Sequence, residues 1–247
     1  MNNNYIIKKF CSLFFILTLC SFINCYLTFK FINIHILPLI LISLSIYLLI
    51  FKRTSLKEQF SMVKPTLYLN KHILISTVLY IIFIIVLFFT LAAILFPFNP
   101  YNNPNWIAFF TNLLYLITGA FQEEIVFRFY AFYELRKFSF KKQIIISSFI
   151  FSIIHLISPI LYGNLFNFKS LLILLFTFSA GIFLAVIYTK NKNLIQVSLI
   201  HLFINISTSL ISIFFIDVLA INLFQSIISF IFLLSSLLIF KSIKSIS

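Results

Sequence analysis

The segment ILISTVLYIIFIIVLFFTLAAILF, residues 73–96, contains no charged side chain. About 20 mainly apolar residues in a helix are enough to cross the hydrocarbon core of a bilayer. The rest of the chain has the same character, because 62% of its 247 residues are hydrophobic and only 9% are charged. Soluble domains usually contain about 25% charged residues. The composition therefore predicts an all-α, polytopic membrane protein and excludes an ordinary soluble domain.

Eight apolar runs in the sequence are long enough to be transmembrane helices. The first resembles a signal peptide, but it lacks an A-x-A cleavage site and is as long as a membrane span, so we interpret it as an uncleaved helix. We expect one compact bundle, which we divide into three N-terminal helices (1–105), a central core (106–216) and a last helix with a basic tail (217–247). The predicted spans are 10–29, 32–51, 73–96, 106–130, 143–160, 170–189, 194–216 and 218–240.

Basic residues favour one orientation of this bundle, because the cytoplasmic loops of membrane proteins are enriched in Lys and Arg. With the N-terminus in the cytoplasm and eight spans, only Lys30 and Lys169 of the 18 basic residues fall outside. Both termini are therefore predicted to be cytoplasmic. The net charge of +13 does not predict nucleic-acid binding, because the cations lie in short clusters between apolar runs. The Ile-, Phe-, Asn- and Lys-rich composition suggests an AT-rich genome, so we expect a multi-pass protein of a bacterial cell membrane.

The segment FQEEIVFRF, residues 121–129, places two carboxylates and a guanidinium inside the fourth predicted span. The chain has only five acidic residues, and a charged group at bilayer depth is costly unless it is paired or hydrated. Glu124 and Arg128 are four residues apart, so they share a helix face and can pair. Glu123 is rotated by about 100° from Glu124 and is left for another partner.

Three further polar side chains lie inside predicted spans: His155 in the fifth, and His201 and Asn205, four residues apart, in the seventh. At about 1.5 Å per residue along each helix, Glu123 and these residues reach overlapping depths, nearer the cytoplasmic side. A desolvated glutamate can act as a general base on water. A histidine can protonate the leaving amine, and histidine and asparagine can stabilise an oxyanion. This set suffices for peptide hydrolysis.

The same side chains also allow metal chemistry. Glu123, His155 and His201 could bind Zn²⁺, and the metal would then activate the water. No HExxH motif, the usual helical zinc signature, is present. Glu123 would have to be the third ligand, and it could not then also be a free base. For this reason we favour a metal-free mechanism, with Zn²⁺ as the alternative.

Three short motifs carry a family resemblance. EEIVFR (123–128) fits EExxxR, FSIIH (151–155) fits FxxxH, and HLFIN (201–205) fits HxxxN. In this order, on three separate spans, they resemble the CPBP family of CAAX-processing and bacteriocin-processing intramembrane proteases, also called the Abi family. The resemblance covers about residues 106–216.

This resemblance implies an α-helical intramembrane endopeptidase with a cavity open to the cytoplasm. Glu123 would activate the water with help from His155, and His201 and Asn205 would form the oxyanion site. Glu124 and Arg128 would have supporting roles. Members of the family have been described both as metalloproteases and as metal-free glutamate proteases. The implied substrate is a hydrophobic or membrane-associated peptide or protein, in CAAX-type processing or in bacteriocin or signal-peptide processing.

Two other functions compete with a protease. A non-catalytic bacteriocin immunity protein would tolerate loss of a motif, yet all three are intact. A proton-coupled transporter would use Glu123 and the histidines as a relay and would show repeat symmetry, which the sequence lacks. The remaining features have simpler interpretations. Phe151 is interpreted as packing, His35 and His72 as non-functional, and close helix approach is expected at Gly119, Ala120, Ala180 and Gly181.

Overall fold

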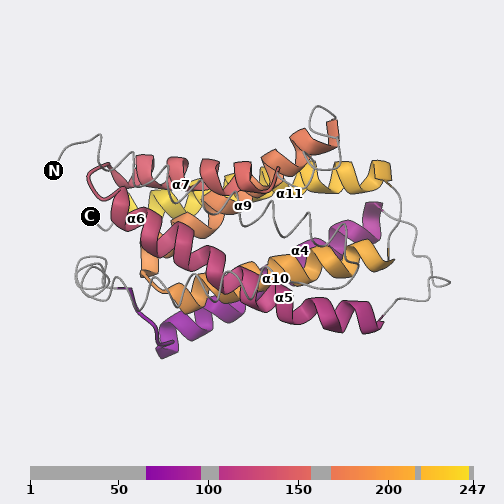
Figure 1. The fold of residues 1–247 in the computed structure, drawn as a ribbon, viewed down its shortest axis with the longest axis horizontal. Helices are drawn as coiled ribbons and strands as arrows, with labels where there is room; N and C mark the ends of the chain where they lie inside the picture. The colour runs from indigo at the N-terminus through magenta and orange to yellow at the C-terminus, as the bar shows by residue number, and fades with distance from the viewer. Residues whose placement is uncertain (1–64, 96–105, 157–167, 215–217, 245–247) are drawn as a thin grey trace, which may run out of the picture.

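The structure, a computed structural model, describes residues 65–95, 106–156, 168–214 and 218–244 (Figure 1). The described ranges are helical and contain no β-strand, which confirms the predicted all-α class for them. The first two predicted spans, 10–29 and 32–51, lie outside the described residues. The described elements are α4 (Lys71–Leu95), α5 (Trp106–Glu124), the π-helix η1 (Ile125–Tyr130), α6 (Ala131–Glu134), α7 (Phe140–Ile154), α9 (Phe168–Asn191), α10 (Leu194–Phe214) and α11 (Val218–Lys244).

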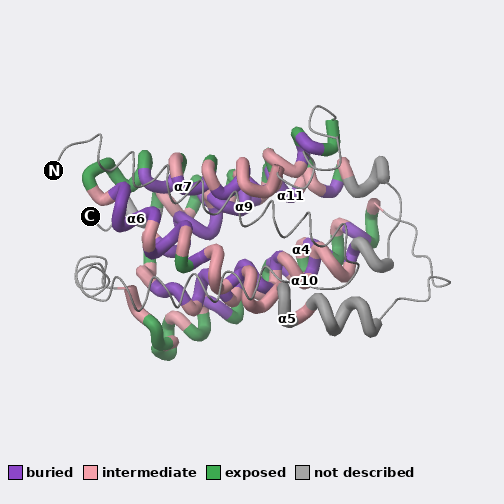
Figure 2. Tube along the Cα trace, viewed as in Figure 1, coloured by how far each residue is buried: buried purple, intermediate pink, exposed green. Residues whose placement is uncertain are grey.

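The long helices form two layers, with α7, α9 and α11 in one and α5, α10 and α4 in the other (Figure 1). Within its layer, α9 packs between α7 and α11, and α10 packs between α5 and α4. The two middle helices form the core, since 61% and 56% of the apolar stretches of α9 and α10 are buried, against 17% and 22% for α4 and α11 (Figure 2). Short connections make helices that follow each other in the chain run in opposite directions.

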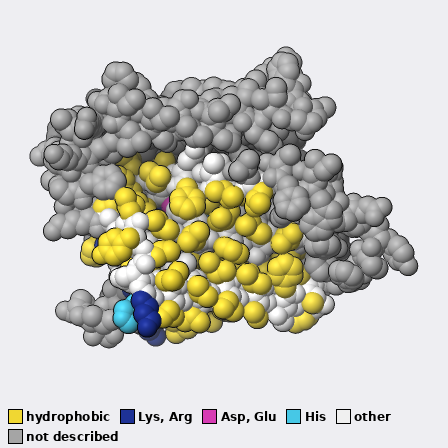
Figure 3. Space-filling model, turned by 90° about the horizontal axis from the view of Figure 1, so that it is seen from below, with side chains coloured by type: hydrophobic (Ala, Val, Ile, Leu, Met, Phe, Trp, Pro, Cys, Tyr) yellow, Lys and Arg dark blue, Asp and Glu magenta, His cyan; other side chains and the backbone are white. Residues whose placement is uncertain are grey.

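Among the described helices, four are long and apolar enough to cross a membrane: α4, α9, α10 over Leu194–Ile211, and α11 over Asn222–Lys241. They match the predicted spans 73–96, 170–189, 194–216 and 218–240 to within four residues at each end. The face over α4 presents a nearly continuous apolar surface with cations at one end (Figure 3). Its exposed side chains include Leu79, Ile82, Val86 and Ile94. The total of eight spans and the cytoplasmic termini remain predictions.

The alternating directions bring most described cations to one end of the bundle, which we call the basic end. It is formed by the start of α4, the α6–α7 connection, the end of α9 and the end of α11. Its residues are Lys71, Arg136, Lys137, Lys141, Lys142, Lys190, Lys192 and Lys241. The start of α9, with Lys169, lies at the other end. This distribution is the one that the positive-inside pattern predicts.

Two predicted spans differ from the observed helices. The span 106–130 is not one α-helix, because α5 ends at Glu124 and continues as the π-helix η1, in which the Ala131 N–H bonds to the Val126 carbonyl five residues back. The span 143–160 was placed too far along the chain, because α7 begins at Phe140 and ends at Ile154. His155 Nδ1 lies 2.8 Å from the Phe151 carbonyl oxygen, the usual acceptor for the His155 backbone N–H. The His155 backbone N–H bonds to the Ser152 carbonyl instead, so the last turn tightens and the helix ends.

Close helix approach was predicted at two glycines, and the structure shows it at one of them. A Cβ added at Gly181 of α9 would lie 3.1 Å from Ser148 Cβ and 3.2 Å from Ser148 Cα, so the predicted close approach of α9 to a neighbour, here α7, is confirmed. Gly119 of α5 is different. No atom of the described chain lies within 4 Å of the point where its Cβ would be, so the prediction of close packing there is wrong.

Candidate active site

A buried ion pair connects α5 to η1 in the middle of the bundle. Arg128 Nε lies 3.0 Å from Glu124 Oε2, and both side chains are completely buried. Arg128 Nη2 also donates to the Gly181 carbonyl of α9 at 3.2 Å. The predicted pairing of Glu124 with Arg128 is therefore confirmed. Burying two charges is expensive, and a buried pair is tolerated only when good geometry and additional hydrogen bonds compensate both partners.

Glu124 has a second partner that the sequence did not reveal. His201 Nδ1 of α10 lies 2.9 Å from Glu124 Oε1, so the two oxygens of this carboxylate bridge Arg128 and His201. His201 is 4% exposed. The contact depends on how α10 packs against α5. No spacing within one helix encodes that packing, which explains why the motifs gave no sign of it.

Glu123 faces the two imidazoles, as the sequence predicted. Its Oε2 lies 3.7 Å from His201 Nε2 and 3.9 Å from His155 Nε2. Both distances exceed the range of a direct hydrogen bond. The Glu123 Oε2 atom is buried and has no hydrogen-bond partner in the described chain. The three atoms therefore surround a gap in which a small group can bond to all of them.

Neighbouring acceptors fix the tautomers of both histidines. His155 Nδ1 lies 2.8 Å from the Phe151 carbonyl, and His201 Nδ1 contacts the Glu124 carboxylate. A carbonyl or an ionised carboxylate can only accept, so each Nδ1 carries the hydrogen. In its neutral form each ring then presents the Nε2 lone pair toward Glu123. Three acceptors converge, and such a set suits a water molecule with two hydrogens or a metal cation.

The side chains of Glu123, His155 and His201 are of the types that bind zinc, but their spacing fits a zinc site less well. Metal-binding imidazoles usually donate their other N–H to a carboxylate or a backbone carbonyl, as both rings do here. Two ligands on a tetrahedral zinc lie about 3.3 Å apart, given metal–ligand distances of about 2.0 Å. The two separations in the structure, 3.7 and 3.9 Å, are wider than this. Within the described ranges, no group of three or more His, Cys, Asp or Glu side chains has the geometry to hold an ion as placed.

Phe151 does more than the packing expected from the sequence. Its ring is 2% exposed, and its centroid lies 4.5 Å from that of His155 and 5.7 Å from that of His201. Arg128 Cζ lies 5.6 Å from the same centroid. One ring on α7 therefore touches both imidazoles and the guanidinium, which come from three different elements. The FxxxH spacing places Phe151 on the face of His155, but the contacts to η1 and α10 could be known only from the packing.

The structure does not join the other predicted residues to this cluster. Asn205 lies one turn beyond His201 on α10, and its side-chain amide makes no hydrogen bond to the described chain, although its carbonyl accepts one from Thr208. Its expected role at the oxyanion stays a prediction. His72 is exposed at the start of α4, away from the cluster, and His35 lies outside the described residues.

Comparison with known proteins gives one family. Residues 103–207 match the model of the family described as type II CAAX prenyl endopeptidase Rce1-like. No curated protein matches the chain. The matched segment contains the three motifs and every residue of the Glu123 cluster, and it supports a protease of the CAAX type in a membrane. The predicted resemblance is thus confirmed: over residues 103–207 the chain is similar to the Rce1-like family of type II CAAX prenyl endopeptidases.

Proposed function

We propose that this protein is an intramembrane endopeptidase in which Glu123, assisted by His155, activates a water molecule for attack on a peptide bond, while His201 and Asn205 stabilise the oxyanion. The observation that carries the proposal is the convergence of Glu123 Oε2 with the Nε2 atoms of both histidines, at 3.9 and 3.7 Å. The family match supports it independently, because the matched model describes endopeptidases.

The reaction follows from the positions of the three groups. Glu123 accepts a proton from the water while its oxygen attacks the substrate carbonyl. The carbonyl becomes a tetrahedral oxyanion, and a donor must stabilise it. Asn205 is the donor that we expect there, together with a protonated His201. The proton held by Glu123 then passes, directly or through His155, to the leaving nitrogen. The products are a carboxylic acid and an amine.

The supporting pair has a defined task in this scheme. Glu124 holds the hydrogen of His201 on Nδ1, which leaves Nε2 directed at the gap. A carboxylate in this position also stabilises the ring when it becomes protonated. Arg128 neutralises Glu124, and Arg128 is itself held by Gly181. Glu124 and Arg128 therefore position His201 and do not touch the substrate.

Exposure separates the reacting groups from the supporting ones. The side chains of Glu123 and His155 are 34% and 31% exposed, whereas those of Glu124 and Arg128 are fully buried. A substrate can therefore reach Glu123 and His155 but not Glu124 or Arg128. Because the surrounding helices are apolar, we propose a hydrophobic or membrane-associated peptide as the substrate, with CAAX-type or bacteriocin or signal-peptide processing as its biological setting. We further propose a bacterial cell membrane, eight spans and cytoplasmic termini.

The same residues define the metal-dependent alternative. Glu123, His155 and His201 would hold Zn²⁺, and the bound ion would supply Lewis-acid activation of water. The protonation of both Nδ1 atoms favours this alternative, and the wide spacing of the ligand atoms favours the metal-free scheme. The family match does not separate the two.

A cleavage assay tests the proposal. The protein is reconstituted in liposomes with a library of hydrophobic peptides, and products are read by mass spectrometry for wild type and Glu123→Gln, with and without a chelator. We expect Glu123→Gln to lower the rate by about 10³-fold or more, because a general base is worth about 10²–10⁴. Ser235→Ala, on the opposite side of the bundle, is the matched control and should cleave like wild type.

Each outcome distinguishes the candidate functions. Cleavage that needs Glu123 and survives the chelator supports the metal-free scheme, and cleavage lost with the chelator and restored by Zn²⁺ supports the metal-dependent one. Identical product profiles for wild type and Glu123→Gln contradict the protease proposal. They would favour an immunity protein without catalysis or a proton-coupled transporter.

A further inference from the structure

The open space at Gly119 lies directly beside the proposed catalytic glutamate. Gly119 and Glu123 are four residues apart on α5, so they share a helix face, with Gly119 one turn farther from the basic end. Apart from Gly119, its two chain neighbours and the adjoining backbone of α5, no atom of the described chain lies within 4 Å of the point where a Gly119 Cβ would be. The bare backbone of α5 is therefore accessible at this point, whereas a larger residue would fill it.

The facing helix brings Asn205 to the same level. The helices α5 and α10 pack against each other and run in opposite directions (Figure 1), and Glu123 is level with His201. One helical turn, about 5.4 Å, toward the far end leads to Gly119 on α5 and to Asn205 on α10. The space beside Gly119 and the Asn205 amide thus lie at one depth.

Two carboxamide side chains on α5 and α10, within one helical turn of this level, have no hydrogen-bond partner in the described chain. The Oε1 atom of Gln122 is buried and makes no hydrogen bond within the described residues. The side-chain amide of Asn205 likewise makes none there. On the helix, Gln122 and Glu123 flank the direction in which Gly119 opens, at about 60° and 40° to either side. Buried polar groups are nearly always bonded, so the Gln122 oxygen is available to accept from a donor of a ligand.

A peptide backbone has the chemistry that these groups require. Each of its units offers one N–H donor and one C=O acceptor, and a carboxamide side chain can bond to either. A glycine allows the backbone of a ligand to approach a helix closely. One to two extended residues span about 3.5–7 Å, which covers the single turn between Glu123 and Gly119.

We propose that the space beside Gly119 is a substrate subsite, an inference that rests on the proposed endopeptidase function. It holds the extended backbone one to two residues from the bond that is cleaved. Gln122 accepts a hydrogen bond from a substrate N–H, and Asn205 bonds to a neighbouring amide group. Gly119 is then a specificity-determining residue, because its missing side chain gives the substrate backbone its place.

Graded substitutions at Gly119 test this subsite. With one ten-residue hydrophobic peptide that wild type cleaves, we expect kcat/KM to fall about 5-fold in Gly119→Ala and about 100-fold in Gly119→Leu, because small displacements from the reactive position are costly. Gln122→Leu should raise KM more than it lowers kcat. Ala93→Leu, which places the same leucine side chain at an exposed position on α4, is the control and should be unchanged.

Stability separates a subsite from a structural role. Alanine is more favourable than glycine inside a helix, and nothing in the described chain obstructs its methyl group at position 119. Gly119→Ala should therefore have a Tm equal to or above that of wild type while its activity falls. Wild-type cleavage rates and the same cleaved bonds in Gly119→Leu would overturn the subsite.

The subsite can be judged even if no cleavage occurs. If wild type cleaves nothing, the proposed function fails, and the readout becomes retention of a pool of ten-residue hydrophobic peptides by Glu123→Gln. Loss of that retention in Glu123→Gln/Gly119→Leu, with retention unchanged in Glu123→Gln/Ala93→Leu, supports the subsite. Equal retention by Glu123→Gln and Glu123→Gln/Gly119→Leu, including none by either, overturns it.

Discussion

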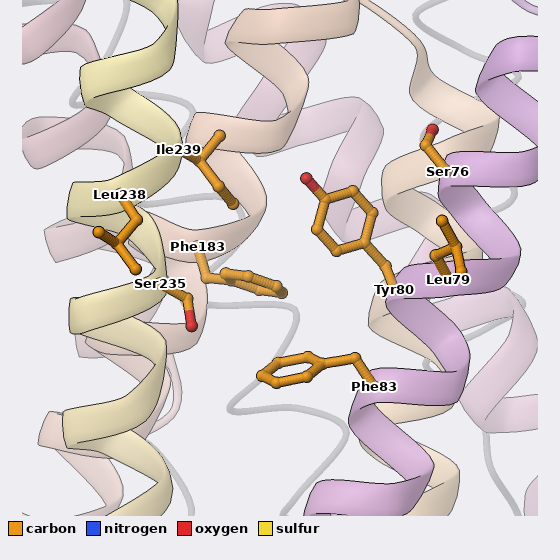
Figure 4. A pocket seen from close by; sticks show the side chains of 8 residues that line it. All are labelled: Ser76, Leu79, Tyr80, Phe83, Phe183, Ser235, Leu238 and Ile239. Carbon is orange, nitrogen blue, oxygen red and sulfur yellow. The ribbon is translucent and has the colours of Figure 1, made fainter.

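The two sides of the helix bundle differ sharply in chemistry although both are built from apolar helices. On the side of α5 and α7, five ionisable groups converge within hydrogen-bonding or near hydrogen-bonding distance. On the opposite side, α4, α9 and α11 line an open pocket of about 410 Å³ (Figure 4). Its lining is apolar except for three hydroxyl groups, and it consists of Ser76, Leu79, Tyr80, Phe83, Phe183, Ser235, Leu238 and Ile239.

This contrast shows on which side of the bundle charged groups are buried. Charged groups inside a membrane bundle are expensive and mark functional sites by default. Within the described part of the bundle they are confined to one side, where each has at least one partner or faces the Glu123 gap. The apolar pocket needs no such partners, and its shape alone gives no reason to assign chemistry to it. The following predictions test this difference between the two sides, from the largest expected effect to the smallest.

Removing Arg128 should have the largest effect on folding. Arg128→Met leaves the Glu124 carboxylate buried with only His201 beside it. Breaking a buried ion pair by removing one partner costs about 3–5 kcal/mol. Thermal unfolding in detergent should show the loss, together with greatly reduced peptide cleavage.

The double variant Glu124→Gln/Arg128→Met is the control for Arg128→Met. It removes both charges, so it should be more stable than Arg128→Met alone, while its activity stays low because His201 loses its carboxylate. A double variant less stable than Arg128→Met would contradict the assignment of Glu124 as the partner.

Replacing the Phe151 ring should affect activity more than stability. Phe151→Leu keeps an apolar side chain of similar reach but loses the flat surface that contacts both imidazoles. Because misplacement of catalytic groups by about 1 Å can cost about 10²-fold, we expect kcat to fall about 30-fold with KM nearly unchanged. Phe183→Leu, which changes a buried ring at the apolar pocket, is the matched control and should leave kcat within about twofold. Equal losses in both variants would show that Phe151 acts only through general packing.

Filling the close approach at Gly181 should have a moderate effect. Gly181→Ala introduces a methyl group 3.1–3.2 Å from Ser148 and Phe151 atoms. Overpacking costs about 1–3 kcal/mol, and the better helix propensity of alanine returns about 1 kcal/mol, so a net loss of about 1 kcal/mol is expected. Chemical unfolding can measure it, and a more stable Gly181→Ala would mean that α7 moves aside without cost.

The sequence predicted what lies along single helices and missed what depends on packing. Long apolar runs gave four of the described helices nearly to their ends, and four-residue spacing gave the pair of Glu124 with Arg128. The positions of the motifs on three spans predicted that Glu123, His155 and His201 lie close together. The hydrogen bond from His201 to Glu124 could not be predicted, because it depends on how far α10 is shifted and rotated against α5. The π-helix has no compositional signature, and the end of α7 depends on a side chain competing with the backbone.

The apolar pocket offers the smallest expected effect and the strictest test of the contrast between the two sides. Tyr80→Phe removes one of the three hydroxyl groups of that pocket and keeps the ring that packs edge-on against Phe183 at 6.0 Å. Substitutions away from special features usually change stability by less than about 0.5 kcal/mol. Stability and peptide cleavage should therefore both match wild type. If Tyr80→Phe lowered cleavage as much as Phe151→Leu does, the two sides would be coupled through α9, and the chemistry could not be assigned to the α5–α7 side alone.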